Sequence, residues 1–592
     1  MNVARILAVS ALATAPLVAQ TPSAPVVPAP RVRLQGEMGS EGEVYRMEGR
    51  DPRRPGESGR LYFNPTFTLG SITVAGNFLL STEGSSLIGL GSLPGRQRIN
   101  QFGLTPSWSW GKVYLGSFSD SWSPLTWGGV RVDGAGVDLS PGTLRLGVFG
   151  GSTRQAVFGG ATSGSFARSI GGARIGVGRR PDHGVATRYI DVTILRVRDD
   201  PASLPPLSDS TPVPYVPDSL AVEPDTALLP HVPIDPYSVT PQENAVMAAS
   251  AGASFLGGAV TWNGELAGSL HSRDVKATAL SDDQINELPK LLRGLVTPRL
   301  GTHADVAWRN QLDLRIARLP GATPTSPRLL TLAIGVQSIG AGYVSLGTPY
   351  LPNDLAGVDV KAQLRFRRWA LSVDGLTQHD NLLGQKLATT DRSRLGFVFT
   401  AQPARGWHSS IRASTVGMVR DVSDSLGAVD YAARMLGATQ TWVPARPGRI
   451  RSVAASYTWQ STEDERASHS SSTLRSHTGD VRIGFPLGAT AAITPSLGLT
   501  TSRTDTASIT RATYGLAADW RDPNRRWVSS ASVNRSQVGR TIAVGSRLSF
   551  RLNVTAADAL TLILRTNRYR SLVDPARDFS ERALNLRWAR RF

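Results

Sequence analysis

The sequence contains no cysteine among its 592 residues. This absence excludes a disulfide-stabilised scaffold, a zinc site built from thiolates and a cysteine nucleophile. Beyond the N-terminus, no stretch has the roughly 18 uninterrupted apolar residues that a transmembrane helix requires. The chain also has no phosphate-binding loop, dinucleotide fingerprint or zinc-protease motif. We therefore expect no cofactor and no bound metal.

Lysine is scarce, whereas arginine is abundant. Lysine and arginine together number 64 against 46 acidic residues, which gives a formal net charge of +18. Lysine occurs at only five positions, so 64 − 5 = 59 of the basic residues are arginines. A basic balance of this size is typical of proteins that bind nucleic acid or an anionic surface.

The first residues are typical of a secretory signal. Arg5 precedes a short apolar stretch from Ile6 to Val18, and residues 1–19 form the expected signal peptide. A leader rich in Pro and Ala follows over residues 20–32, and we expect it to be a disordered spacer. Export would separate the chain from the cell's nucleic acid, so we expect no nucleic-acid partner.

From residue 33 to residue 592, segments of 10–15 residues alternate apolar and polar side chains and are separated by turn residues. A period of two residues places the two sets on opposite faces of a strand. The clearest case is Thr541–Val554. Its apolar set is Ile542, Val544, Leu548, Phe550 and Leu552, and its polar set includes Arg547, Ser549, Arg551 and Asn553.

The polar faces carry charged residues in the middle of strands, as at Asp359, Lys361 and Arg365. A soluble sandwich also alternates, but here the pattern persists with few helical stretches between strands. In a membrane barrel the polar face lines a wet lumen and the apolar face meets lipid. The sequence therefore predicts an all-β fold, in which residues 33–592 form a single large antiparallel transmembrane β-barrel without a separate plug domain.

The chain ends in an alternating segment whose apolar face consists of Leu584, Leu586, Trp588 and Phe592. This segment resembles the C-terminal signature of bacterial outer-membrane β-barrel proteins, in which a terminal Phe follows apolar residues at alternate positions. The resemblance implies that these four residues are an assembly signal read by the barrel-assembly machinery, and that the last strand closes the barrel against the first. Arg590 departs from the pattern, although an arginine can snorkel towards lipid headgroups.

Short connections alternate with longer, more polar ones along the chain. Counting back from Phe592 gives about 26 strands, with 24 or 22 as alternatives, and the first strand near Leu34–Gly49. An even number places both termini at one end, which the resemblance implies is periplasmic. The long connections are then extracellular loops, among them 120–129, 342–356 and the two longest, 199–242 and 273–302. The last of these contains a candidate short apolar helix, expected to fold into the lumen or to cap its mouth.

A barrel of 26 strands has a backbone diameter on the order of 50 Å. An open lumen of that width would breach the membrane, so we expect loops, or an unknown periplasmic or plug partner, to occlude it. Basic residues on the polar faces are expected to line the lumen and to favour anions, unless carboxylates such as Asp313, Asp359 and Asp374 neutralise them. These residues are Arg315, Lys361, Arg365, Arg547, Arg551 and Arg565.

Residues near the predicted strand ends suit a lipid environment. Paired arginines at turns suit phospholipid headgroups, and acidic loops suit divalent cations shared with lipopolysaccharide, so outer-membrane lipids and lipopolysaccharide are the expected partners. Tryptophans near the strand ends are expected to form aromatic girdles, with core packing of some of them as the alternative. They are Trp108, Trp110, Trp122, Trp127, Trp369, Trp407, Trp442, Trp527 and Trp588.

The sequence favours a pore or transport channel in the cell outer membrane, and not an enzyme. One alternative is a non-conducting barrel with a structural or surface-binding role. A third possibility is a hydrolase at the barrel rim, which would use His379 with Asp380 or His271 with Asp274.

Overall fold

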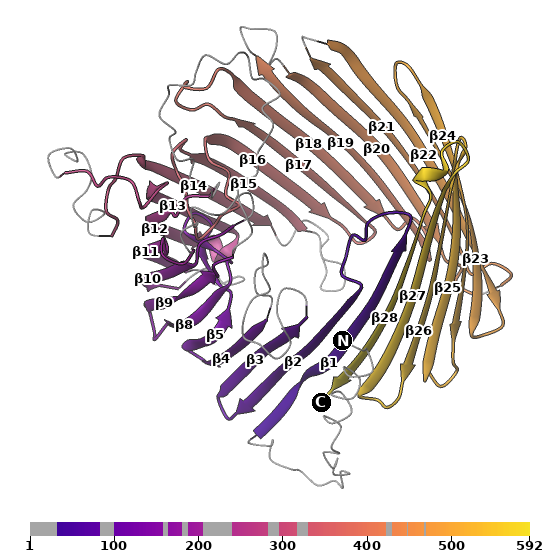
Figure 1. Ribbon diagram of the computed structural model, residues 1–592, viewed down its shortest axis with the longest axis horizontal. Coiled ribbons are helices and arrows are strands. Elements are labelled where there is room, and N and C mark those ends of the chain that lie inside the picture. The colour runs from indigo at the N-terminus through magenta and orange to yellow at the C-terminus, as the bar shows by residue number, and fades with distance from the viewer. Residues whose placement is uncertain are drawn as a thin grey trace, which may run out of the picture.

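The computed structural model describes residues 32–82, 100–157, 164–179, 187–204, 239–281, 295–316, 329–421, 429–446, 448–466 and 469–592. Within these ranges, 26 strands form one antiparallel sheet that closes on itself as a barrel (Figure 1). The predicted fold class and strand count are confirmed. No helix in the described ranges is long and apolar enough to cross a membrane. The predicted signal peptide, and the leader except Val32, lie outside the described residues.

The first half of the barrel wall contains twelve strands that pair with their neighbours in chain order. Their bounds are β1 (Val32–Glu48), β2 (Glu57–Leu69), β3 (Ile72–Ser81), β4 (Gln101–Trp108), β5 (Gly111–Phe118), β8 (Val132–Leu139), β9 (Leu144–Arg154), β10 (Arg168–Gly178), β11 (Arg188–Asp199), β12 (Glu243–Phe255), β13 (Val260–Ser272) and β14 (Thr302–Ile316). Two further short strands, β6 (Ser121–Ser123) and β7 (Trp127–Gly128), pair only with each other.

The second half of the wall completes the ring. Its strands are β15 (Leu329–Ile339), β16 (Leu355–Arg365), β17 (Trp369–His379), β18 (Thr389–Ala401), β19 (Trp407–Asp421), β20 (Val429–Trp442), β21 (Ser452–Arg466), β22 (His469–Leu487), β23 (Ala491–Arg503), β24 (Ser508–Arg521), β25 (Trp527–Val538), β26 (Thr541–Asn553), β27 (Asp558–Ser571) and β28 (Phe579–Arg591). Two single turns of 3-10 helix, η1 (Leu256–Gly258) and η3 (Pro575–Arg577), lie in connections.

The first and last strands form a closing seam. β1 and β28 pair continuously from Glu37 opposite Arg591 to Glu48 opposite Ser580. The pairing continues beyond β28, because Gly36 and Phe592 exchange two backbone hydrogen bonds of 2.9 and 3.1 Å. Every strand in the described wall therefore has two neighbours, and the sheet has no open edge.

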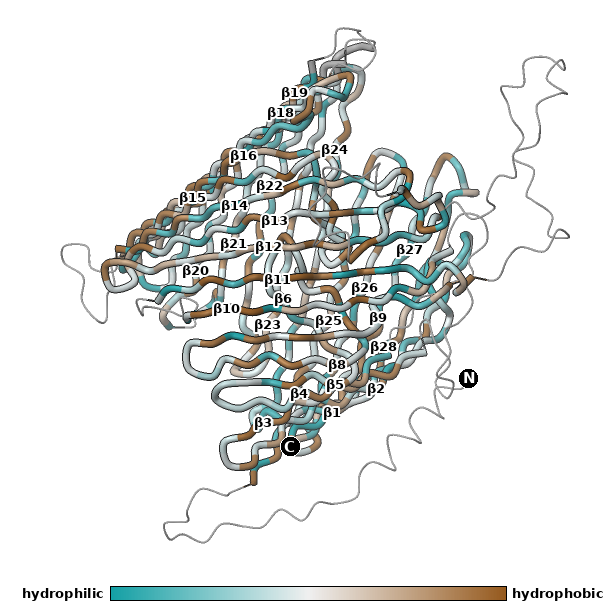
Figure 2. Tube along the Cα trace, turned by 90° about the vertical axis from the view of Figure 1, so that its left-hand side faces the viewer, coloured by the Kyte–Doolittle hydropathy of each residue, from teal (hydrophilic) through white to brown (hydrophobic). Residues whose placement is uncertain are grey.

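The two faces of the wall differ in the way that the alternation predicts. On β11, Ile190 and Val192 point outward and are 58% and 41% exposed. Asp191 and Thr193, which alternate with them, point inward and are 1% and 4% exposed. Figure 2 shows the same alternation of hydrophobic and hydrophilic positions along many strands. The barrel thus has an apolar exterior and a polar interior.

The connections also differ between the two ends of the barrel. Most of those at the end that carries Phe592 are short, as at Gly70, whose positive φ of 58° suits the tight turn between β2 and β3. Every connection of more than twelve residues lies at the opposite end, such as 119–131, 200–242 and 340–354. The wall is also uneven in height, because β22 has 19 residues and β5 has eight.

The described end of the connection 273–302 does not enter the lumen. Leu295 and Val296 pack with Ala245, Met247 and Leu270 on the outward side of β12 and β13. This part of segment 273–302 therefore lies against the outside of the wall. Most of the candidate apolar helix, and residues 205–238 of the loop 199–242, lie outside the described residues.

Candidate functional site

The candidate site is the barrel interior, which two connections enter. One runs from residue 119 to residue 131 and contains β6 and β7, and the other runs from residue 340 to residue 354 between β15 and β16. Their apolar residues share a buried cluster with inward-facing residues of the wall, including Leu195 and Val246. We call these two connections the inner loop pair.

Aromatic side chains form the centre of this cluster. Trp127 is completely buried and stacks on Phe149 with ring centroids 4.0 Å apart, while Trp122 meets Trp127 edge-on at 5.4 Å. Burial of such rings contributes roughly 1.5–3 kcal/mol each. The expectation that Trp122 and Trp127 belong to an aromatic girdle is therefore wrong, because both rings lie inside the barrel.

Glycines in the wall make room for these rings. A β-carbon added at Gly147 would lie 2.8 Å from the Trp122 ring, and one added at Gly172 would lie 2.6 Å from the Phe149 ring. Both distances are shorter than real contacts of this kind. The glycine-rich strands β9 and β10 thus form a hollow on the inner wall that fits the inner loop pair.

Hydrogen bonds join the two connections to each other. Tyr343 Oη donates to the Leu125 carbonyl at 2.7 Å, and Gly128 N donates to the Gly347 carbonyl at 3.1 Å. Ser345 Oγ donates to the Thr126 carbonyl at 2.5 Å. Buried backbone carbonyls that would otherwise lack partners are satisfied in this way.

The wall holds the second connection through one buried amide. Asn244 on β12 is fully buried. Its Nδ2 donates to the Val344 carbonyl at 2.9 Å, and its Oδ1 accepts from Leu346 N at 3.0 Å. This two-point contact mimics a backbone pairing and fixes the loop against β12.

A third connection, residues 380–388 between β17 and β18, anchors Asp354, the last residue of the connection 340–354. The Asp354 carboxylate accepts backbone hydrogen bonds from Asn381 at 3.1 Å and Leu382 at 2.8 Å, and it pairs with Lys386 Nζ at 2.5 Å. Burial alone would raise the pKa of Asp354, but the hydrogen bonds from Lys386, Leu382 and Asn381 outweigh it and lower this pKa overall. Lys386 also approaches Asp380, at 3.4 Å.

Charges on the wall beside the inner loop pair are paired and buried. Arg145 on β9 meets Asp191 at 3.0 Å, with both side chains at most 7% exposed. Arg174 on β10 meets Asp138 at 2.7 Å. Arg168 meets the fully buried Asp199 at 2.7 Å. These groups neutralise one another, so this side of the interior offers little free charge.

The six basic residues predicted to line the lumen lie on other parts of the wall. Arg315 is on β14, Lys361 and Arg365 are on β16, and the remaining three are on β26 and β27. Within the described residues, none of the six has a carboxylate within salt-bridge distance. Asp374, a predicted partner, instead pairs with Arg394 at 2.7 Å, and Asp313 accepts from Gln311 at 3.1 Å.

Two of these arginines are direct neighbours across a strand pair. The register places Arg547 on β26 opposite Arg565 on β27, on the face that includes Asn567 and Ser532. They line a hollow of about 500 Å³. Like charges directly opposite one another are unfavourable unless an anion lies between them. Guanidinium, amide and hydroxyl groups are the donors that carboxylate and phosphate groups accept from.

A second hollow of about 710 Å³ lies at the closing seam. Its lining includes Arg551, Glu37 and Arg587, and the last two form an ion pair at 3.2 Å. Arg551 donates to Asn553 at 3.2 Å. The seam is thus held by charge pairing on its inward side, with Arg551 beside it.

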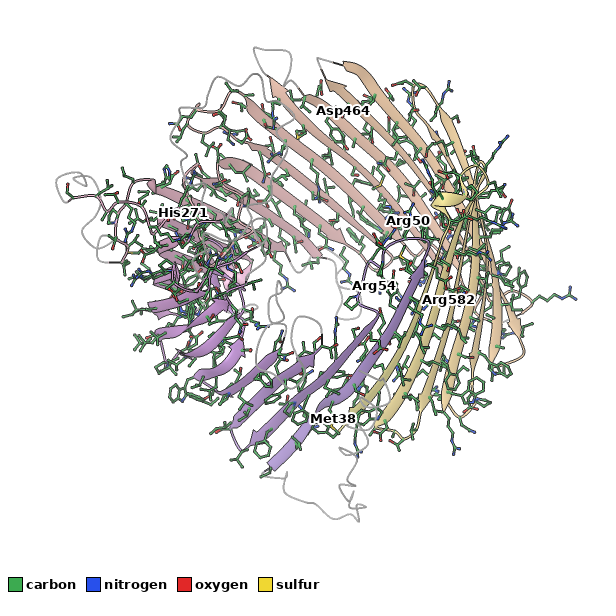
Figure 3. The ribbon with its side chains drawn as sticks, in the orientation of Figure 1. Met38, Arg50, Arg54, His271, Asp464 and Arg582 are labelled. Carbon is green, nitrogen blue, oxygen red and sulfur yellow. The ribbon has the colours of Figure 1, made fainter. Side chains whose placement is uncertain are left out.

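The histidine pairs considered for a rim hydrolase are not assembled. His271, labelled in Figure 3, lies opposite His303 on neighbouring strands and is 6% exposed. The described residues contain no hydrogen bond between His271 and Asp274 or between His379 and Asp380. Asp274 instead accepts from Lys276 N. The described chain also contains no cluster of three residues able to hold a metal ion.

Comparisons with known proteins give similarity at a low level. No protein-family model matches the chain, and neither does any curated protein. The P pilus usher (PapC) translocation pore shares 10% identity over 94% of this chain and 99% of its own, with a TM-score of 0.31. The FrpB iron transporter from Neisseria meningitidis shares 11% identity over 94% and 81%, with a TM-score of 0.34.

A third solved structure, the anion-selective porin from Comamonas acidovorans, shares 11% identity over 48% of this chain and 93% of its own, with a TM-score of 0.24. All three are bacterial outer-membrane barrel proteins. Similarity at this level says nothing about the solute, the mechanism or the partners of the chain.

Proposed function

We propose that the chain is an outer-membrane channel that passes small anions, and that its inner loop pair narrows one side of the lumen. One observation carries this proposal, which is the contrast between two parts of the inner wall. Beside the inner loop pair, Arg145 and Arg174 are neutralised by buried carboxylates. On β26 and β27, Arg547 and Arg565 face each other with no carboxylate in salt-bridge distance among the described residues.

Unneutralised guanidinium groups on a wet wall raise the local concentration of anions and exclude cations. Paired and buried charges do neither, because their fields cancel. The anion path is therefore expected along the side that carries Arg547, Arg551 and Arg565. The outward apolar face and the seam closed on its full length support a barrel that sits in lipid.

Ion selectivity in planar bilayers tests the proposal. The purified barrel is placed between two KCl solutions of unequal concentration, and the reversal potential gives the ratio of chloride to potassium permeability. We expect chloride to be preferred. The triple variant Arg547→Gln, Arg551→Gln and Arg565→Gln is expected to lose most of this preference while it keeps its conductance.

A matched control removes three charges from the outward face. The substitutions are Arg475→Gln on β22, Arg503→Gln on β23 and Arg535→Gln on β25. The register places all three side chains on the outward face of the wall. This variant is expected to keep the wild-type reversal potential. Equal selectivity in all three proteins, or a preference for potassium in the wild type, contradicts an anion path at these arginines.

A second candidate function is a non-conducting barrel, and the packing of the inner loop pair favours it. Trp127 and Tyr343 are as buried as residues of a soluble core, so these loops form a fixed obstruction. Bilayer recordings of the wild type and of a variant with residues 121–128 replaced by a short glycine and serine linker separate the two functions. Current from the wild type supports a channel, whereas a silent wild type, with or without current from the variant, supports the non-conducting barrel.

A further inference from the structure

Three outward-facing arginines gather where the barrel closes. Arg582 on β28, labelled in Figure 3, lies opposite Arg46 on β1 in the register of the seam. On the other side of β28, Arg568 on β27 lies opposite Ser580, one outward position from Arg582. All three are exposed. We call them the seam arginines.

Arg46 and Arg582 are directly opposite, which places their β-carbons about 5 Å apart, and Arg568 is the diagonal neighbour of Arg582, at about 7–8 Å. Nothing in the described chain compensates their charge at close range, since none has a carboxylate within salt-bridge distance. Of the acidic residues that face this surface, Glu48 accepts from Ser580 Oγ at 3.1 Å. Asp578 lies 4.0 Å from Arg570, and Glu57 lies one strand away on β2, opposite Val44.

Two like charges directly opposite each other destabilise a sheet. The arrangement becomes favourable when an anion with several oxygens bridges the guanidinium groups. Phosphate is well suited to this position, because arginine binds it through two parallel N–H donors. The seam arginines are therefore a site that lacks its anion within the chain itself.

An apolar surface begins directly beside these arginines. Thr566 on β27 lies opposite Arg582, and the next outward row towards Phe592 consists of Leu564, Leu584 and Val44 on β27, β28 and β1. Leu564 and Leu584 are 39% and 41% exposed. The same face continues through Leu562 and Leu586 to Trp588. The outward face of the seam thus carries arginines near the end with the long connections and an apolar strip from there towards Phe592.

We propose that the seam arginines hold the phosphate of a phosphorylated membrane lipid, whose acyl chain lies along the strip from Leu584 to Trp588. A lipid fits better than free phosphate, because only a lipid also covers the adjoining apolar residues. The site lies at the end of the barrel with the long connections, which places it in the leaflet of lipid-A-type phosphoglycolipids. The lipid spans β27, β28 and β1, and so it holds the seam closed. This inference does not depend on whether the barrel conducts.

Native mass spectrometry of the intact barrel in a neutral detergent tests this site. The protein is titrated with diphosphorylated lipid A, with lipid A from which the phosphates have been removed, and with inorganic phosphate. We expect a bound adduct only with the first. The variant Arg46→Gln, Arg568→Gln and Arg582→Gln is expected to weaken its binding at least about tenfold, because charge-assisted hydrogen bonds are lost.

The matched control removes three arginines from the inward face: Arg392→Gln, Arg412→Gln and Arg511→Gln. It is expected to bind lipid A like the wild type. Equal binding by the seam variant and the wild type overturns the site, and so does equal binding of the dephosphorylated lipid. Binding of inorganic phosphate with the same affinity as lipid A points to a free anion and overturns the lipid assignment.

A misfolded seam variant is recognised by its gel migration before and after boiling. In that case the single variant Arg582→Gln takes its place, because it keeps Arg46 and Arg568 and removes the like-charge contact. It is expected to weaken lipid A binding measurably, and unchanged binding counts against the site.

Discussion

Tyr343 and Leu125 lie 218 residues apart in the sequence, and a hydrogen bond of 2.7 Å joins the Tyr343 phenol to the Leu125 carbonyl. Each residue is 1% exposed. Water cannot replace either partner at such a buried position, so loss of one leaves the other unsatisfied. This contact therefore holds the two connections of the inner loop pair in a fixed position relative to each other.

Removing the phenol oxygen tests this relationship. Tyr343→Phe keeps the ring but leaves the Leu125 carbonyl without its donor, which is expected to cost about 1–3 kcal/mol of unfolding free energy. Urea unfolding followed by tryptophan fluorescence measures it. Tyr350→Phe, at a side chain that is 95% exposed, is the control and is expected to change nothing. Equal stability of the two variants would show that the contact is not formed.

The hollow on the inner wall depends on missing side chains. Gly147→Val places its β-carbon 2.8 Å from the Trp122 ring, and we expect a loss of about 1–3 kcal/mol from overpacking. Gly150→Val on the same strand is the control, because the nearest atom to its β-carbon is 3.9 Å away. Thermal unfolding of both variants in detergent distinguishes them. A wild-type midpoint for Gly147→Val contradicts the proposed fit of ring and glycine.

The sequence was sufficient to predict the wall, because strand alternation is local. The alternation within each segment shows which of its residues share a face. The expected strand Thr541–Val554 ends one residue earlier than predicted, at Asn553. The first strand was expected at Leu34–Gly49 and is Val32–Glu48. The closing of β28 on β1 followed from the C-terminal resemblance. Such features depend on nearest neighbours in the chain or in the sheet.

The inner loop pair could not be predicted in the same way. Connections 120–129 and 342–356 were expected to be extracellular loops, since nothing local distinguishes a loop that folds inward from one that stays outside. Their burial depends on contacts such as that of Ser345 with Thr126, across more than two hundred residues. One available signal was the presence of Trp122, Leu125 and Trp127 within a single short connection. An exposed loop rarely carries so much apolar surface.

The C-terminal residue offers a test of the assembly signal. Phe592 exchanges backbone hydrogen bonds of 2.9 and 3.1 Å with Gly36, and its ring stacks on Phe63 at 5.8 Å. Deletion of Phe592 is expected to lower the amount of folded barrel in the outer membrane severalfold. The measurement is the fraction that migrates differently on gels before and after boiling. Phe592→Tyr keeps the ring and is expected to assemble, and normal assembly of the deletion argues against the signal.

The Asp354 anchor predicts a dependence on pH. The pKa of Asp354 is lowered in the folded protein, so its contribution is present above the ordinary carboxyl value of about 4 and is lost as the pH falls below it. The pKa of Lys386 is raised, chiefly by the hydrogen bond to Asp354, so its contribution is complete below about 10.4 and is lost only at higher pH. Between these limits the anchor should hold the end of the inner loop pair.

A fluorescent label at this end measures the release. The chain has no native cysteine, so Asn353→Cys gives a single attachment point beside Asp354. We expect the anisotropy of the label to stay constant from neutral pH to about pH 4 and to fall in more acidic solution. In an Asp354→Asn background the anisotropy should already be low at neutral pH and should not respond to acid. A wild-type acid transition in that background would mean that another group, and not Asp354, controls the loop.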